Sequence, residues 1–245
     1  MTNFAKRTLR RWQLAMKKSA IICFLGTDGS GKSTLAKYLC GELKRAQYNV
    51  AYIWWLEGEQ SLLRKAIKAF GKSVDMARDA RHERPGMQRQ RTTDRLFRSF
   101  YPVLPFLDYL RFGLIHAWLP KIASKDKIII FDRFMYDVVL ALSEEFEFTE
   151  RRRKRLFELC NLLLPKPDLV FIIDVPAELS YSRKKDEIRS VREAEEKRES
   201  YKELGSLLQT LTPGRLVQID NSCDVAEAEA EILKETLAFI GGDGS

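Results

Sequence analysis

The sequence is poor in the residues that form disulfides and hold transition metals. Its 245 residues include four cysteines and two histidines, and the cysteines stand far apart, at Cys23, Cys40, Cys160 and Cys223. They form no C-x-x-C pair, the spacing typical of zinc sites and redox centres. Because disulfides are rare in reducing compartments, we interpret the chain as a protein with free cysteines and no cysteine-based metal site.

A long apolar run is also missing. The most apolar stretch, residues 100–119, is interrupted by Asp108, Arg111 and His116, whereas a helix that crosses a bilayer needs about 20 mostly apolar residues. We therefore predict no transmembrane segment and expect a cytoplasmic protein. With 45% hydrophobic residues the chain can bury one substantial core, so the first expectation for its length is a single α/β domain.

Acidic residues are absent from the first 18 positions. This segment supplies most of the net charge of +8 through six basic side chains, Lys6, Arg7, Arg10, Arg11, Lys17 and Lys18. Four interpretations fit it: contact with an anionic surface, contact with nucleic acid, an organelle import sequence, or a solvated helix that packs on the domain. All four stay open, and we predict a basic extension at residues 1–18 followed by one folded domain at 19–245.

The most informative segment is a strand–turn–helix pattern at residues 20–37. An apolar run, Ile21 to Leu25, leads into Gly26-x-x-x-x-Gly31-Lys32-Ser33, and apolar residues at helical spacing follow directly. In this context the pattern is that of a phosphate-binding P-loop. An ordinary glycine-rich turn is the alternative, but the strand before it and the helix after it favour a phosphate site.

Each residue type in this segment has a chemical reason. Glycine lets the backbone turn with its N–H groups toward a bound triphosphate, and the following helix adds its positive dipole end. We predict that Lys32 bridges the β- and γ-phosphates of ATP and that the Ser33 hydroxyl binds Mg²⁺. The predicted ATP-binding residues are Gly26, Asp28, Gly29, Ser30, Gly31, Lys32, Ser33, Thr34 and Asn221.

Five short apolar segments alternate with helical stretches along the chain. They lie at residues 21–25, 50–55, 127–131, 169–173 and 216–219. Strands that alternate with helices form a parallel sheet covered on both faces, with ligands at the carboxyl ends of the strands. An aspartate follows three of the strands, at Asp132, Asp174 and Asp220. The predicted fold is an α/β three-layer sandwich of the P-loop NTPase type, with acidic groups beside the phosphate site.

Arginines cluster in two further regions. Seven lie between residues 78 and 98, where they either bind phosphate or nucleic acid or form a solvated helix face, and acidic neighbours favour the solvated face. The second cluster, at about residues 178–192, follows the fourth strand and includes Arg183 and Arg189. We predict a mobile basic lid there, because the transition state of phosphoryl transfer spreads negative charge over the phosphate oxygens.

Six segments occur in an ordered set along the chain. They are Gly26-Thr-Asp28-Gly-Ser-Gly-Lys-Ser-Thr, Ile130-Phe-Asp132-Arg133-Phe, Ile173-Asp174-Val-Pro, the basic lid, Arg198-x-x-Tyr201 and Ile219-Asp220. This set resembles the thymidylate kinase family of nucleoside monophosphate kinases, from about residue 20 to the end of the chain. The resemblance implies a five-stranded parallel sheet of order 2-3-1-4-5.

The resemblance also implies how the acceptor is held. Asp28 would contact a sugar hydroxyl of the acceptor and Arg133 its phosphate, while Arg111 would take the place of the arginine that reads the thymine edge. Leu107 stands where the family stacks the base on a Phe, so a nucleotide acceptor requires that a neighbouring ring, Phe106, Tyr109 or Trp55, restores the stacking. The arginine that the family has after the second strand is absent. The predicted acceptor-binding residues are Asp28, Phe106, Tyr109, Arg111 and Arg133.

The catalytic residues follow from the same resemblance. The P-loop has no basic residue between Gly26 and Gly31, which is similar to family members whose catalytic arginine comes from the lid. Asp132 would organise Mg²⁺ and water. The predicted catalytic residues are Lys32, Asp132, Arg133, Arg183 and Arg189, and the predicted metal ligands are Ser33 and Asp132.

Together these expectations describe a Mg²⁺- and ATP-dependent kinase. It would transfer the γ-phosphoryl group of ATP to a nucleoside monophosphate, with conversion of dTMP to dTDP as the first candidate reaction. Two alternatives stay open: a P-loop kinase for a nucleoside or sugar-like acceptor, and a regulatory or nucleic-acid-associated P-loop NTPase. The expected partner is a small-molecule acceptor, and a homodimer is compatible with the sequence.

Overall fold

A five-stranded parallel sheet forms the middle layer of the domain. The computed structural model describes residues 19–55, 103–119 and 126–241. The strands are β1 (Ala20–Gly26), β2 (Asn49–Trp54), β3 (Lys127–Asp132), β4 (Leu169–Asp174) and β5 (Arg215–Asp220). They pair in parallel in the order β2-β3-β1-β4-β5. The predicted strands, their order and the fold class are confirmed.

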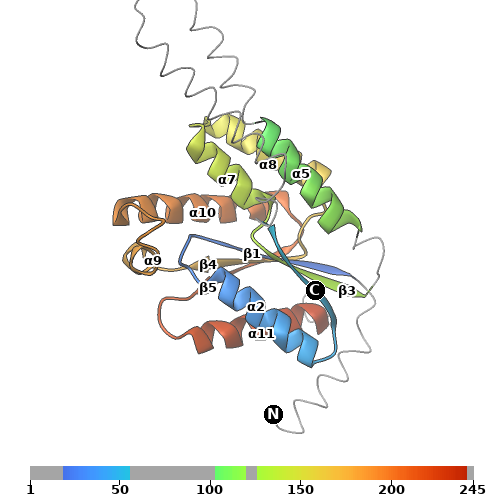
Figure 1. Ribbon diagram of the computed structural model, residues 1–245. Coiled ribbons are helices and arrows are strands. Elements are labelled where there is room, and N and C mark those ends of the chain that lie inside the picture. The colour runs from blue at the N-terminus through green and yellow to red at the C-terminus, as the bar shows by residue number, and fades with distance from the viewer. Residues whose placement is uncertain (1–18, 56–102, 120–125, 242–245) are drawn as a thin grey trace, which may run out of the picture.

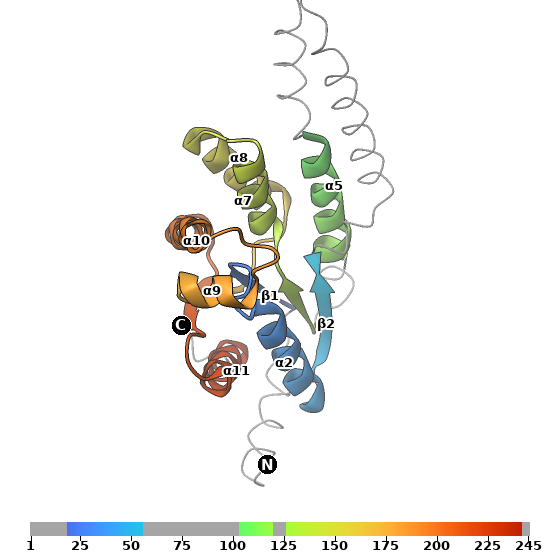
Figure 2. The same cartoon turned by 60° about the vertical axis from the view of Figure 1, so that its left-hand side comes forward.

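Two layers of helices cover the sheet (Figures 1 and 2). On one face lie α2 (Lys32–Arg45) and α11 (Val225–Gly241). On the other face lie α5 (Val103–Gly113), α7 (Met135–Glu145), α8 (Glu150–Leu163) and α10 (Val191–Leu211). A short π-helix, η3 (Leu114–Trp118), continues α5, and α9 (Ala177–Arg183) packs against α10. This is the three-layer arrangement that the alternating strands and helices predicted.

The central strand β1 explains why the sheet is covered on both faces. It is buried along its whole length, as expected for a parallel strand with helices on either side. Alternate side chains enter different cores: Ile21 and Cys23 pack toward α7 and α10, whereas Ile22 and Phe24 pack toward α2 and α11. The helix α2 is thereby held at the end of β1, and its first turn is fixed beside the P-loop.

Helix α10 is tied to the carboxyl end of the sheet by two polar contacts. The guanidinium of Arg198 donates two hydrogen bonds to the Asp174 carboxylate, at 2.7 and 2.8 Å. The Tyr201 hydroxyl donates to Asp137 on α7, at 2.6 Å. The Ser190 hydroxyl begins the helix by accepting from the Glu193 N–H, at 3.2 Å. These contacts position the end of the lid segment close to the P-loop.

Two sequence expectations concern segments outside the described residues. The basic extension, residues 1–18, and the arginine cluster at residues 78–98 lie outside the described residues, and the interpretations given for them stay predictions. Among the described helices, none is both long and apolar enough to cross a membrane.

Candidate functional site

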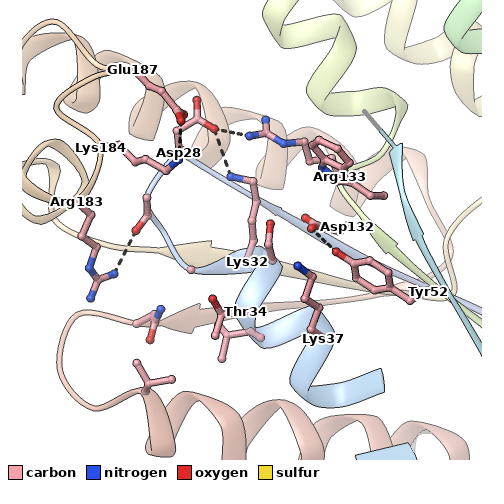
Figure 3. A pocket seen from close by; sticks show the side chains of 17 residues that line it. Asp28, Lys32, Thr34, Lys37, Tyr52, Asp132, Arg133, Arg183, Lys184 and Glu187 are labelled. Carbon is pink, nitrogen blue, oxygen red and sulfur yellow. Dashed lines mark hydrogen bonds and ion pairs between the residues drawn. The ribbon is translucent and has the colours of Figure 1, made fainter. Parts of the chain in front are cut away.

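A cavity of about 940 Å³ lies at the carboxyl ends of the strands, where ligands bind in open α/β sheets. Its walls come from the P-loop and α2, the ends of β2 and β3, the lid, and the loop after β5 (Figure 3). The side chains that matter below are Asp28, Lys32, Ser33, Thr34, Lys37, Tyr52, Trp54, Asp132, Arg133, Arg183, Lys184 and Asn221. Most of the predicted nucleotide-binding and catalytic residues therefore lie together.

The P-loop backbone is fixed at two glycines. Gly31 has φ +90°, and a Cβ there would lie 2.4 Å from Asn221 Nδ2. Gly26 has φ +149°, and a Cβ there would lie 2.5 Å from the Ile173 carbonyl oxygen. Both positions thus require glycine for conformation and for space. Asn221 also donates from Nδ2 to the Ser30 carbonyl at 2.7 Å, so the loop after β5 supports the turn.

Lys32 and Asp28 form the charged centre of the cavity. Lys32 is only 4% exposed, and its Nζ donates to the Thr27 carbonyl at 2.8 Å and lies 3.6 Å from Asp28 Oδ1. Burial, and then the neighbouring Arg133, lower the pKa of Lys32 to about 8. Burial would raise the pKa of Asp28, but Lys32 and Arg133 lower it to about 2. A phosphate placed here would stabilise the ammonium form of Lys32.

Arg133 reaches the same carboxylate from the other side. It adopts φ +69°, a left-handed conformation that is uncommon outside glycine, and its N–H donates to the Phe24 carbonyl at 3.1 Å. Its guanidinium pairs with Asp28. Burial would lower the pKa of Arg133, but Asp137 and Asp28 raise it above its usual range. The strained turn after β3 therefore aims a permanent cation at the P-loop.

Asp137 supports that turn and was missed in the sequence. It is buried on the first turn of α7, where Oδ2 accepts from the Phe134 N–H at 2.8 Å and Oδ1 accepts from the Tyr201 hydroxyl at 2.6 Å. Burial raises the pKa of Asp137. A signal was present, since an acidic residue three positions after the start of a helix is typical of a capping arrangement.

Asp132 and Tyr52 connect β3 to β2 at the wall of the cavity. Asp132 is buried; its Oδ2 accepts from the Tyr52 hydroxyl at 2.7 Å. Its Oδ1 is buried without a hydrogen-bond partner among the described residues. Trp54 is the neighbour of Asp132 in the β2–β3 register and lines the same cavity. Sequence analysis missed Tyr52 and Trp54, although alternation along an edge strand places both on one face.

A cation fits this arrangement when ATP is present. The unpartnered Asp132 Oδ1 and the Ser33 hydroxyl face the same cavity. Within the described ranges, no group of three or more His, Cys, Asp or Glu side chains gathers that could hold a metal by itself. Mg²⁺ commonly takes one or two protein ligands and completes its shell with substrate phosphates and water. Ser33 and Asp132 have the chemistry for that role.

The lid contacts the P-loop through its first half. Ser180 Oγ donates to the Asp28 carbonyl at 2.6 Å, and the Arg183 guanidinium donates to the Gly29 carbonyl at 3.2 Å. Arg183 lines the cavity. Arg189, the other predicted lid arginine, is exposed and does not line this cavity; its backbone N–H donates to Glu193. The two candidates thus occupy different surroundings.

The residues predicted to bind the acceptor base are not brought to the cavity. Phe106 and Tyr109 are buried in the core beneath α5, and the Arg111 guanidinium is exposed and pairs with Asp108 at 3.0 Å. Trp55, named as a substitute stacking ring, is fully buried against Phe131 and Phe134. These three rings pack in the hydrophobic core instead, because Phe106 and Tyr109 lie on the face of α5 that is turned toward the core and Trp55 follows the end of β2 on the same side.

The chain matches a known family over most of its length. The family model for the ABC transporter matches residues 9–177, which include the P-loop, α2, β3 and the cavity residues Asp28 and Asp132. The chain is a P-loop NTPase of the family that this model describes. ATP binding by the cavity follows from that membership and from the geometry of the P-loop.

A solved kinase structure is similar in fold to this P-loop NTPase. The thymidylate kinase of Ehrlichia chaffeensis matches with a TM-score of 0.52 and 20% sequence identity, over 89% of this chain and 98% of that chain. At this identity the likeness concerns the fold. No curated protein matches the chain.

Proposed function

We propose that this P-loop NTPase is a phosphotransferase that moves the γ-phosphoryl group of ATP to a small acceptor. The observation that carries the proposal is the extent of one cavity. It contains the P-loop and, continuous with it, a space walled by Tyr52, Trp54, Asp132 and Arg133. A nucleotide triphosphate accounts for the P-loop part. The remaining side chains offer a cation, carboxylates and aromatic rings to a second molecule.

The residues along the cavity suggest an order of binding sites. Arg183 lies toward one end, Lys32 near the middle and Tyr52 toward the other end (Figure 3). Asn221 lines the same cavity and donates to the Ser30 carbonyl of the P-loop. The nucleoside of ATP would lie toward Asn221, and the acceptor toward Tyr52. Lys32 would then contact the β- and γ-phosphates, which lie between the two substrates.

The transfer itself needs positioned charge more than covalent chemistry. An acceptor oxygen forms a bond to the γ-phosphorus while the bond to the β–γ bridging oxygen breaks, and that oxygen leaves with the electron pair as part of ADP. Lys32 and Arg183 would stabilise the charge on the transferred group. Arg133, held by Asp28, would orient an acceptor phosphate. Mg²⁺, held by Ser33 and Asp132, would neutralise further charge on the phosphates.

A nucleoside monophosphate remains the first candidate acceptor. The thymidylate kinase of Ehrlichia chaffeensis has the same fold, and the ordered motifs of this chain resemble that family. A phosphorylated acceptor also fits the cation at Arg133, since its phosphate oxygen is already ionised and needs no base to remove a proton. We therefore keep dTMP as the first substrate to assay, with sugar-like acceptors next.

A second function is favoured by the family match. The family model that matches is the one for the ABC transporter. The competing proposal is therefore ATP hydrolysis that is coupled to a partner. None of the described helices is long and apolar enough to cross a membrane. The basic residues of the chain would suit a polyanionic partner.

The test measures ADP formation under three conditions: ATP alone, ATP with each candidate acceptor, and ATP with a polyanion such as heparin or nucleic acid. A phosphotransferase should form ADP quickly only with an acceptor, and a phosphorylated product of the matching mass should appear. Stimulation by the polyanion, with no acceptor dependence, would favour the coupled NTPase.

A further inference from the structure

An exposed tryptophan lines the acceptor end of the cavity. The side chains of β2 alternate, so Trp55 enters the core, where it is fully buried, while Trp54 is 40% exposed and lines the cavity. Trp54 belongs to none of the hydrophobic clusters of the described residues. An indole ring left in a cavity, with no core to complete, offers a large flat apolar surface to a ligand.

Polar groups surround this ring. Trp54 is paired in register with Asp132, and neighbouring strands are about 4.8 Å apart, so the two side chains stand side by side on one face. Tyr52 lies two residues earlier on the same face and donates to Asp132 at 2.7 Å. Lys37, on α2, lines the same cavity. The indole therefore shares the cavity with a carboxylate, a phenol and an ammonium group; Figure 3 shows the Asp132, Tyr52 and Lys37 side chains that carry them.

This combination favours one chemical class of acceptor. An indole face binds the apolar face of a ring, carboxylates accept hydrogen bonds from hydroxyls, and cations bind phosphate. We propose that the acceptor is a phosphorylated ring compound whose ring stacks on Trp54 and whose phosphate lies between Lys37 and Arg133. This inference rests on the proposed phosphotransfer and names the acceptor class for the same cavity. A free sugar phosphate and the sugar–phosphate part of a nucleotide both supply this chemistry.

The proposal makes Trp54 a residue that determines specificity. Stacking contacts of this kind change affinity by about fivefold or more when the aromatic ring is removed. We expect removal of the ring to change the KM for the acceptor and not the KM for ATP, because ATP would lie at the other end of the cavity. A purely structural role for Trp54 would instead change the stability of the fold and affect both substrates alike.

The experiment measures binding and turnover in the full chain and in three variants. Trp54→Ala removes the ring, and Trp54→Phe keeps a smaller ring and serves if the alanine variant does not fold. Trp118→Phe is the matched control, since Trp118 is 39% exposed and does not line the cavity. The probes are ribose 5-phosphate, glucose 6-phosphate and dTMP, with glycerol 3-phosphate as the phosphorylated compound that has no ring.

We expect at least one ring compound to bind and to change the tryptophan fluorescence, and glycerol 3-phosphate to do neither. Trp54→Ala should weaken that binding, and raise the acceptor KM, by about fivefold or more; Trp54→Phe should do so by less. The ATP KM should change little, and Trp118→Phe should behave as the unaltered chain. Which ring compound binds best distinguishes a sugar phosphate from a nucleotide.

Two failures can be told apart. If a ring compound binds through Trp54 and no phosphoryl group is transferred, the proposed phosphotransfer is wrong and the stacking surface stands. If transfer occurs with an acceptor KM that is the same in folded Trp54→Ala, the stacking surface is wrong and the phosphotransfer stands. Absence of binding by every ring compound, or equal use of glycerol 3-phosphate, also overturns the stacking proposal.

Discussion

The two ends of the cavity are built from different parts of the chain. At the P-loop end, backbone N–H groups and two sterically required glycines lie within one continuous segment. At the acceptor end, side chains from β2, β3 and α2 converge, with Tyr52 and Asp132 joined by a hydrogen bond. A backbone cradle recognises phosphate in general, whereas converging side chains select one molecule. Substitutions at the first end should therefore stop the chemistry, and substitutions at the second should change which acceptor is used.

The largest effect is expected at Lys32. Lys32→Ala should lower kcat by ~100-fold or more, because a positioned charge on the transferred group is lost. Lys37→Ala is the matched variant at the other end: Lys37 lines the same cavity but is exposed. We expect it to raise the acceptor KM by a few fold and to spare kcat. Steady-state kinetics of both variants check the contrast, and a folded Lys32→Ala protein with unchanged kcat would refute it.

The alanine variants of the two lid arginines should differ in kcat by about an order of magnitude. Arg183 lines the cavity and contacts the P-loop, while Arg189 does not line it. Arg183→Ala should lower kcat by at least about tenfold, with a smaller change in the ATP KM, as for a contact made mainly in the transition state. Arg189→Ala should stay within about twofold. Equal losses in the two variants would mean that the lid rearranges to bring both arginines to the phosphates.

A third pair of variants compares the effect on fold stability of replacing a glycine in the P-loop and a glycine within a helix. Gly31→Ala should destabilise the fold by ~1–2 kcal/mol or more, because φ is +90° and the new Cβ would meet Asn221. Gly41→Ala, in the same helix with no atom near its Cβ position, should stabilise it by about 0.5–1 kcal/mol. Chemical denaturation measures both. A neutral Gly31→Ala would show that the turn relaxes easily.

The smallest effect concerns pH. In the ligand-free protein the pKa of Lys32 is lowered to about 8, chiefly by burial. Bound phosphate favours the charged form, so ATP binding should take up a proton above pH 8, and affinity should fall about fourfold between pH 7 and 8.5. Calorimetry in buffers of different ionisation enthalpy measures the proton uptake. Flat affinity up to pH 9, without uptake, is inconsistent with the depressed pKa.

The same contrast explains what could be predicted from the sequence. The P-loop is a contiguous motif with a known backbone shape, so Gly26, Gly31 and Lys32 were identified from the sequence. The strand order was predicted from the resemblance to the thymidylate kinase family. The acceptor end depends on which face of β2 a side chain occupies. Stacking was therefore predicted at Phe106, Tyr109 or Trp55, and all three rings are buried in the core, whereas Trp54, the residue before Trp55, lines the cavity. The spacing before Asp132 also led us to predict that Arg111 reads the acceptor base. That spacing does not reveal the ion pair that Arg111 forms with Asp108.

Arg183 and Arg189 teach a related lesson. Both belong to the basic lid segment, and charge density alone gave them equal roles. Their surroundings differ because α9 ends at Arg183, against the P-loop, and α10 begins at Val191, where Glu193 accepts from the Arg189 N–H. Local helix boundaries decide which of two similar side chains faces a ligand, and such boundaries are the least certain part of a sequence-based prediction.

The fate of the γ-phosphoryl group tests the central claim most directly. With ATP labelled at the γ-phosphate, the full chain should be incubated with the acceptor that binds best, and the label followed into organic product and inorganic phosphate. The account predicts label in the acceptor, equal in amount to the ADP formed, and none without Lys32. Label found only in inorganic phosphate, at the same rate with or without the acceptor, would contradict it.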